Sequence, residues 1–280
     1  MPMTRSEVRE SKAPPCVVLT HDGPVSFITL NRPHAYNAID AEVTRSLSAA
    51  IAEIEASPVA RVVVLRGAGN GFCAGGDLPY FAAQGDELRR TVERMLDDGA
   101  RFLQALQNTD KLVIASVHGT AAGAGLSLVV ACDFCIAASD AVFVPAYATL
   151  AVSPDMGGTA NLVRAIGYRQ AMRVCFLEDR LTAADAERFG IVSRIVDPWA
   201  LPDATLALAL RLSGLSRACA ESTKALLRQA SRTELSEQLA AESDSFQACI
   251  HGPETQAALE RFNQKRATSD SLPNATETRG

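Results

Sequence analysis

Short apolar runs, separated by turn residues or by helical patterns, fill the first two thirds of the chain. Residues 16–31 contain two β-rich runs around the turn sequence His-Asp-Gly-Pro, and this arrangement predicts a hairpin. Beyond Asp40, which has the character of an N-cap, apolar residues recur at helical spacing until Ser57-Pro58. A helix is therefore expected directly after the hairpin.

Two further apolar runs share another arrangement, in which a strand leads into a glycine-rich bend. Residues 61–67 ("RVVVLRG") precede the loop "GAGNGFCAGGDLP", and residues 111–119 ("KLVIASVHG") precede a helix expected over about 122–131. Residues 86–107 have the apolar side of a helix, and "DFCIAA" is a further strand. The repeated strand, strand, helix order predicts an α/β core over residues 15–198.

From Thr182 onward the pattern changes to successive helices, interrupted by the strand "GIVSRIV". We expect residues 199–267 to form a helical layer that packs on the core or on another subunit. The polar ends, residues 1–14 and 268–280, are expected to be disordered tails. The helical segments of the layer are predicted at 203–213, 217–230, 234–249 and 253–266.

Composition and charge narrow the class of protein. The 280 residues are 48% hydrophobic and 21% charged, as in an ordinary enzyme, and the net charge of −5 argues against a nucleic-acid partner. Seven cysteines are scattered through apolar surroundings, so we expect reduced thiols in a cytoplasmic protein. Cys132 and Cys135 form a CxxC without a second pair, so no metal site is expected. The charged, proline-containing N-terminus lacks the apolar centre of a signal peptide.

The uncharged stretch from Leu112 to Cys132 is long enough to suggest a membrane helix. Gly119, Gly123 and Gly125 fall in the middle of it, and we therefore expect no membrane span. The stretch also lacks the third glycine of a dinucleotide fingerprint and the Gly-Lys-Ser/Thr of a phosphate loop.

Two interpretations of these glycines remain. Small residues could simply let the helix pack closely on the sheet, or they could expose backbone N–H groups at the first helical turn for a negatively charged oxygen. Residues 70–78 ("NGFCAGGDL") also follow a buried strand and expose backbone N–H groups. Two such bends favour the second interpretation, because each could supply one donor to an oxyanion.

Five motifs occur in a fixed order: "LNRPHAYNAID", "CAGGDL", "HGTAAGAG", "PDMGGTANLVRAIG" and "LTAADAERFGIVSRIV". Over residues 16–266 this series resembles the crotonase, or enoyl-CoA hydratase/isomerase, superfamily. The pattern is most similar to ring-1,2-epoxyphenylacetyl-CoA isomerase-like and enoyl-CoA isomerase members. The resemblance implies an α/β spiral of repeated β-β-α units with a C-terminal α-helical layer, assembled as a homotrimer or as a hexamer of two trimers.

The resemblance also implies an acyl-CoA thioester substrate and no separate cofactor. The thioester oxygen would accept hydrogen bonds from the backbone N–H groups of Gly76 and Ala124. Asp77 has a second interpretation, in which it caps and orders the glycine loop. For Arg32, Lys111 and Lys265 the alternative is that they are ordinary solvated surface cations. The implied substrate- and CoA-binding residues are Arg32, Ala74, Gly75, Asp77, Leu78, Lys111, Gly123, Tyr147 and Lys265.

By the same resemblance, Ser127 and Tyr147 stand where hydratases carry two water-activating glutamates. Neither residue is a carboxylate base, which disfavours efficient hydration. Asp155 stands where the isomerase-like members place a catalytic aspartate, although an Asp before a helix is also a common N-cap. A single base can take a proton from one carbon and return it at another, so we expect an enoyl-CoA isomerase with Asp155 as the proton carrier.

Two alternatives stay open. The first is an enoyl-CoA hydratase, or another crotonase-type lyase or hydrolase, that uses Asp155 differently. The second, from another class, is a catalytically silent acyl-CoA-binding protein. In each enzymatic case, the resemblance implies a role in fatty-acid or in aromatic-acid catabolism.

Overall fold

The computed structural model describes residues 14–270, with side chains as far as Gln264. The two predicted tails therefore lie almost entirely outside the described residues. The chain divides into two compact units, the first ending at Ser213 and the second beginning at Gly214.

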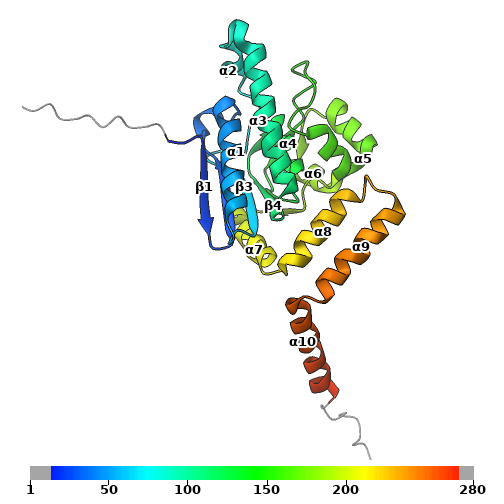
Figure 1. Cartoon of the computed structure of the whole chain (residues 1–280). Helices are drawn as coiled ribbons and strands as arrows, with labels where there is room; N and C mark the ends of the chain where they lie inside the picture. The colour runs from blue at the N-terminus through cyan, green and yellow to red at the C-terminus, as the bar shows by residue number, and fades with distance from the viewer. Residues whose placement is uncertain (1–13, 271–280) are drawn as a thin grey trace, which may run out of the picture. The chain divides into compact units, whose positions relative to one another are not determined.

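A six-stranded sheet forms the centre of the first unit (Figure 1). The predicted hairpin is confirmed as an antiparallel pair, and every other neighbouring pair in this sheet is parallel. Val62–Leu65 and Val113–Val117 lie at its middle and are almost entirely buried, which explains why both runs are continuously apolar. In spatial order the strands are β1 (Val17–Asp22), β2 (Val25–Leu30), β3 (Val62–Gly67), β4 (Leu112–Val117), β6 (Phe134–Ala138) and β9 (Arg194–Val196).

Helix α1 (Ala41–Ala56) packs on β1 and β2, and α3 (Leu88–Asn108) lies beside α1 (Figure 1). Asp40 caps α1 as predicted, because its carboxylate accepts hydrogen bonds from the backbone N–H groups of Glu42 and Val43 at 3.0 and 2.9 Å. Helix α7 (Leu201–Ser213) contacts β3, β4 and β6. The first unit thus extends beyond the predicted boundary at residue 198.

The uncharged stretch is a strand, a bend and a short helix. Gly119 turns the chain after β4 into β5 (Thr120–Ala122), and α4 (Ala124–Ala131) follows with seven of its eight residues buried. A helix buried on all sides explains the lack of charge without a membrane. In the described part of the chain, no helix has both the length and the apolarity needed to cross a membrane.

The structure also contains a second, three-stranded sheet that was not predicted from the sequence. Its order is β5, β7 (Val142–Val144) and β8 (Leu181–Thr182), and strands of two or three residues are too short for a recognisable period. The remaining elements of the first unit are α2 (Leu78–Ala82), α5 (Gly158–Leu177), α6 (Ala183–Phe189) and 3-10 turns at Pro33–Ala35, Gly85–Glu87 and Pro198–Ala200.

The second unit consists of α8 (Arg217–Gln229), α9 (Leu235–Ile250) and α10 (Pro253–Asp270). These helices match the predicted segments at 217–230, 234–249 and 253–266. Helix α10 continues through residues 268–270, which the sequence analysis assigned to the tail. The first helix-breaking residue after Gly252-Pro253 is Pro273, so the local sequence contains no earlier stop signal.

Candidate active site

The two glycine-rich bends predicted from the sequence are held together by backbone hydrogen bonds. Cys73 and Ala121 form a parallel bridge. The Cys73 N–H donates to the carbonyl oxygen of Thr120 at 3.0 Å, and the Ala122 N–H donates to the carbonyl oxygen of Cys73 at 2.9 Å. Segments separated by nearly fifty residues in the chain therefore form one structural feature.

Glycine is required where the bends touch. Gly75 has a φ of +92° and Gly123 a φ of +50°, in the region that residues with a Cβ rarely adopt. A Cβ on Gly75 would stand 2.8 Å from the carbonyl oxygen of Ala122. A Cβ on Gly125 would collide with Cys73, so the close-packing interpretation also holds for that glycine.

The N–H group of Gly76 is left available by its strand-like pairing. Gly76 lies opposite Ile39 in a parallel bridge, where the Ile39 N–H donates to Gly75 at 2.7 Å and the Asp77 N–H donates to Ile39 at 2.9 Å. In a parallel ladder the bonds of Ile39 go to the residues on either side of its partner. The Gly76 N–H therefore points away from Ile39.

The N–H group of Ala124 is available for a different reason. Ala124 is the first residue of α4, whose N-cap is Gly123 and has no side chain to act as a cap. The first N–H groups of a helix have no acceptor within the helix, and they carry the positive end of its dipole. Gly76 and Ala124 both line one cavity, so the expected pair of donors faces a common space.

Arg32 and Asp77 secure the start of this loop. The Arg32 guanidinium lies 2.9 Å from the carboxylate of Asp77 and 3.1 Å from that of Asp40, and it donates to the carbonyl oxygen of Ala38 at 2.6 Å. Asp40 and Asp77 are the N-caps of α1 and α2. The loop-ordering interpretation of Asp77 is thus confirmed, whereas a contact of Arg32 with CoA stays a prediction.

The cavity has a volume of about 480 Å³ and mostly apolar walls. Ala74, Gly75, Leu78, Gly123 and Tyr147 line it, and their contact with the substrate stays a prediction. Helices α1, α2 and α3 supply much of the remaining wall, which no sequence motif marked. These additional wall residues are Ile39, Thr44, Phe81, Val92, Met95, Leu96, Val144, Ala146, Thr149, Leu150, Val152 and Met156.

Asp155 also lines the cavity, and it is the only carboxylate among the described lining residues. The Tyr147 hydroxyl donates a hydrogen bond to Asp155 Oδ1 at 2.5 Å. The Ser127 hydroxyl lies 3.0 Å from the Tyr147 hydroxyl. Tyr147 therefore contacts the acid directly, and Ser127 reaches it only through the Tyr147 hydroxyl.

Burial shifts the pKa values of both Asp155 and Tyr147. Burial raises the pKa of the Asp155 carboxyl, and the hydrogen bond from Tyr147 opposes that rise. Burial also raises the pKa of Tyr147 strongly, and the neighbouring negative charge of Asp155 adds to the effect. Tyr147 is therefore a protonated donor wherever Asp155 is ionised.

The N-cap interpretation of Asp155 is wrong. The N-cap of α5 is Gly157, and that helix has no side-chain cap. The backbone carbonyl of Asp155 accepts from the Gly158 N–H at 2.8 Å, while its side chain is bound to Tyr147. The carboxylate is therefore directed to the cavity rather than to the helix start.

Lys111 and Lys265, the other two predicted CoA contacts, do not line this cavity among the described side chains. Lys111 is 4% exposed, with its ammonium 2.8 Å from Asp110 and 3.3 Å from Glu55. It precedes β4, whereas the bend at Gly119 follows that strand, roughly 20 Å away for six extended residues. Lys111 is held by this ion pair and does not line the cavity, and its contact with CoA stays a prediction. Lys265 belongs to α10, and its side chain lies outside the described residues.

Comparison with known proteins identifies the family of this chain. The enoyl-CoA hydratase/isomerase family model matches residues 20–269. A probable enoyl-CoA hydratase of Rhizobium meliloti is 35% identical over 244 residues, which are 87% of this chain and 93% of the relative. The 1,2-epoxyphenylacetyl-CoA isomerase of Escherichia coli is 37% identical over 203 residues, which are 70% of this chain and 76% of the relative.

Solved structures show the same fold. The crystal structure of an enoyl-CoA hydratase from a Polaromonas species has a TM-score of 0.84 and 32% identity, covering 89% of this chain and 97% of that one. A putative enoyl-CoA hydratase/isomerase from Mycobacterium abscessus has a TM-score of 0.85 and 30% identity, covering 89% and 96%. The chain therefore belongs to the enoyl-CoA hydratase/isomerase family, within the crotonase superfamily.

Proposed function

We propose that this family member is an enoyl-CoA isomerase, which moves a carbon–carbon double bond within an acyl-CoA thioester. The observation that carries the proposal is the single carboxylate, Asp155, on a cavity wall that also bears the Gly76 and Ala124 amides. A double-bond shift requires one base that releases the proton it has taken, whereas the glutamate pair of a hydratase is replaced by hydroxyl groups.

In the proposed reaction, the Asp155 carboxylate takes a proton from C2 of a 3-enoyl-CoA. The electron pair of the broken C–H bond moves into the thioester, whose oxygen becomes an enolate and accepts hydrogen bonds from the Gly76 and Ala124 N–H groups. Each such donor contributes about 3 kcal/mol to the stabilisation of an oxyanion. Protonated Asp155 then returns the proton to C4, which yields the 2-enoyl-CoA and the ionised acid.

The chemistry needs no separate cofactor, because every electron and proton remains with the substrate or Asp155. The acyl group is proposed to be uncharged, since the cavity wall beyond the two amides is formed mainly by side chains such as Phe81, Met95 and Leu96. Ala74, Gly75 and Leu78 would lie along the thioester end of the substrate.

Hydration is the second candidate, and the names of relatives favour it. Several relatives are named enoyl-CoA hydratases, including the one from Rhizobium meliloti. Water would then be activated by Asp155 alone. The replacement of both glutamate positions by Ser127 and Tyr147 is the reason that we place this activity second.

The test compares two substrates with wild-type and Asp155→Ala protein. A 3-enoyl-CoA gains conjugated-enone absorbance when it is isomerised, and crotonyl-CoA loses it when it is hydrated. We expect the wild type to isomerise, to exchange C2 protons in D₂O, and to lose turnover by a factor of about 10² to 10⁴ on Asp155→Ala.

The outcomes separate the alternatives. Faster hydration of crotonyl-CoA than isomerisation would favour the hydratase. Tight CoA binding without C2 exchange would favour the silent acyl-CoA-binding protein. Wild-type turnover in Asp155→Ala would refute the role of this acid.

We also propose assembly as a homotrimer, or as a hexamer of two trimers, as the family resemblance implies. Support comes from large apolar side chains that are exposed in the second unit of the chain. These include Leu227, Leu235, Leu239, Phe246 and Phe262.

A further inference from the structure

Three polar side chains from separate parts of the chain form a series that ends at the proposed base. Ser127 lies in α4, Tyr147 lies in the loop after β7, and Asp155 lies in the turn before α5. The contact between the Ser127 and Tyr147 hydroxyls measures 3.0 Å, and that between the Tyr147 hydroxyl and Asp155 Oδ1 measures 2.5 Å.

The direction of the hydrogen bonds follows from the number of protons available. The Tyr147 phenol has one proton, and an ionised Asp155 can only accept. Tyr147 must therefore donate to Asp155, and its oxygen is left to accept from Ser127. The series runs from the Ser127 O–H through the Tyr147 O–H to the carboxylate.

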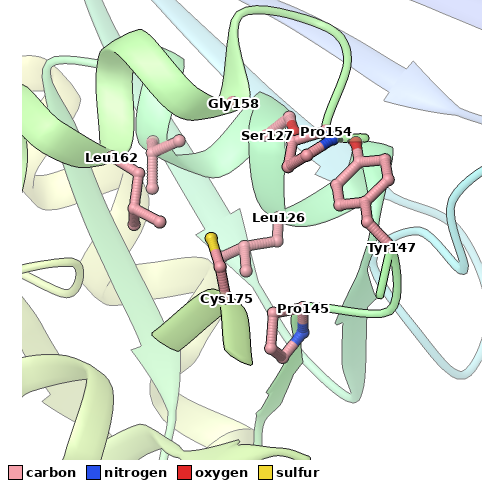
Figure 2. A pocket seen from close by; sticks show the side chains of 9 residues that line it. Leu126, Ser127, Pro145, Tyr147, Pro154, Gly158, Leu162 and Cys175 are labelled. Carbon is pink, nitrogen blue, oxygen red and sulfur yellow. Dashed lines mark hydrogen bonds between the residues drawn. The ribbon is translucent and has the colours of Figure 1, made fainter. Parts of the chain in front are cut away.

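The surroundings hold this series in place. Ser127 is 2% exposed, and a Cβ on Gly158 would collide with its hydroxyl, so helix α5 lies directly against it. Figure 2 shows Ser127 and Tyr147 on the wall of a small pocket that also includes Pro145 and Pro154. Its volume of about 20 Å³ has room for roughly one water molecule. On this side the pocket is too small to take the Tyr147 ring, whose other side faces the larger cavity.

We propose that Tyr147 is a positioning residue for Asp155, and that Ser127 in turn orients the Tyr147 hydroxyl. By binding Oδ1, Tyr147 fixes the rotation of the carboxylate and favours its ionised form. This inference rests on the proposed function, because it assigns the series to the residue that we propose to carry the proton.

The matched variants are Tyr147→Phe and Ser127→Ala, with Tyr168→Phe as the control. Tyr147→Phe keeps the ring and removes only the hydroxyl. Tyr168 lies on the exposed side of α5 and outside the site, so its substitution removes the same atom without touching Asp155.

The first measurement is the pKa of Asp155, followed by ¹³C NMR of the carboxyl carbon and assigned with Asp155→Asn. We expect Tyr147→Phe to raise it by about one pH unit, as the loss of a hydrogen bond to a charged group predicts. Ser127→Ala should give a smaller rise, and Tyr168→Phe none. This measurement does not depend on which reaction the protein catalyses.

The second measurement is the pH dependence of isomerisation. Tyr147→Phe should lower kcat about tenfold with KM within about threefold, and move the acid limb of kcat toward higher pH. An acid limb and an Asp155 titration both unchanged in Tyr147→Phe would overturn the inference. If Tyr147→Phe fails to fold, Ser127→Ala decides the question through the same two shifts.

The two proposals fail in different ways. If the Asp155 titration shifts but Asp155→Ala keeps wild-type turnover, the proposed function is wrong, while the contact by which Tyr147 positions the Asp155 carboxylate is supported. If Asp155→Ala abolishes turnover but Tyr147→Phe shifts neither quantity, the proposed function stands and only the positioning role is refuted.

Discussion

At the scale of single residues, the proposed role of Asp155 comes with a cost in stability. Its carboxylate is partly removed from water, and the hydrogen bond from Tyr147 offsets only part of that loss, so its pKa in the folded chain is raised. A raised pKa in the folded state means that the folded chain binds this proton more tightly than the unfolded chain. Stability from this group is therefore present at low pH and declines as the pH rises above the ordinary carboxyl range.

This linkage predicts the effect of Asp155→Asn on thermal unfolding. At pH 7 the variant should have a higher Tm than the wild type, because an amide of the same shape carries no charge to be desolvated. The difference should shrink as the pH falls and vanish below about pH 4, where the wild-type acid is protonated in both states. A Tm difference that grows toward acid pH would contradict this account. Calorimetry between pH 3 and pH 8 measures it directly.

At the scale of elements, the site depends on two bends that no single helix or strand contains. Gly75 and Gly123 let the bends approach, the bridge between Cys73 and Ala121 joins them, and Arg32 ties the caps of α1 and α2 beside them. The N–H groups of Gly76 and Ala124 are thereby fixed by backbone geometry. Rigid placement of this kind is what makes an oxyanion donor effective before the charge develops.

Gly75→Ala tests this arrangement, with Gly85→Ala as its control. Both glycines have positive φ, but a Cβ at Gly85 meets nothing within 4 Å, whereas one at Gly75 meets the Ala122 carbonyl. Backbone strain should destabilise both variants by about 1–2 kcal/mol. Only Gly75→Ala should also lower kcat, by about 10- to 100-fold, because it displaces an oxyanion donor. Equal activity losses in the two variants, measured beside their urea midpoints, would contradict the displacement.

The elements that the sequence predicted well are those with a clear period or a specific motif. The strands around Val64 and Ile114 and the helix capped by Asp40 fall where apolar patterning and capping place them. Gly76 and Ala124 could be predicted to lie at one cavity because both bends carry motifs. The contact from Tyr147 to Asp155 spans an irregular loop, so no periodicity could indicate it.

The partners of charged side chains could not be predicted from the sequence. Arg32 and Lys111 both look like free cations in the sequence, yet each is bound to carboxylates in the fold. Their partners are set by tertiary contacts with Asp77 and Glu55, at separations that no local pattern encodes. The apolar wall of the cavity could not be predicted either. Helices α1, α2 and α3 contribute to it, and the sequence pattern does not distinguish these apolar residues from core residues.

At the scale of the whole molecule, the second unit carries a row of exposed apolar side chains on one of its helices. Leu235, Leu239 and Phe246 of α9 follow one another at intervals of four and seven residues, so they share a helix face. All three are well exposed within this single chain. A row of large apolar side chains on one face is typical of a surface that is covered by another copy of the protein.

Phe246→Glu on α9 tests the proposed assembly. A charge introduced at a buried contact must be desolvated, so the variant should dissociate from three times the chain mass to a single chain in light scattering at micromolar concentration. Gln247→Glu is the matched control, because it adds the same charge one position along the same helix, on a different side. The control should keep the trimer mass. If Phe246→Glu remains trimeric while its circular dichroism spectrum matches the wild type, then this face of α9 is not the contact between subunits.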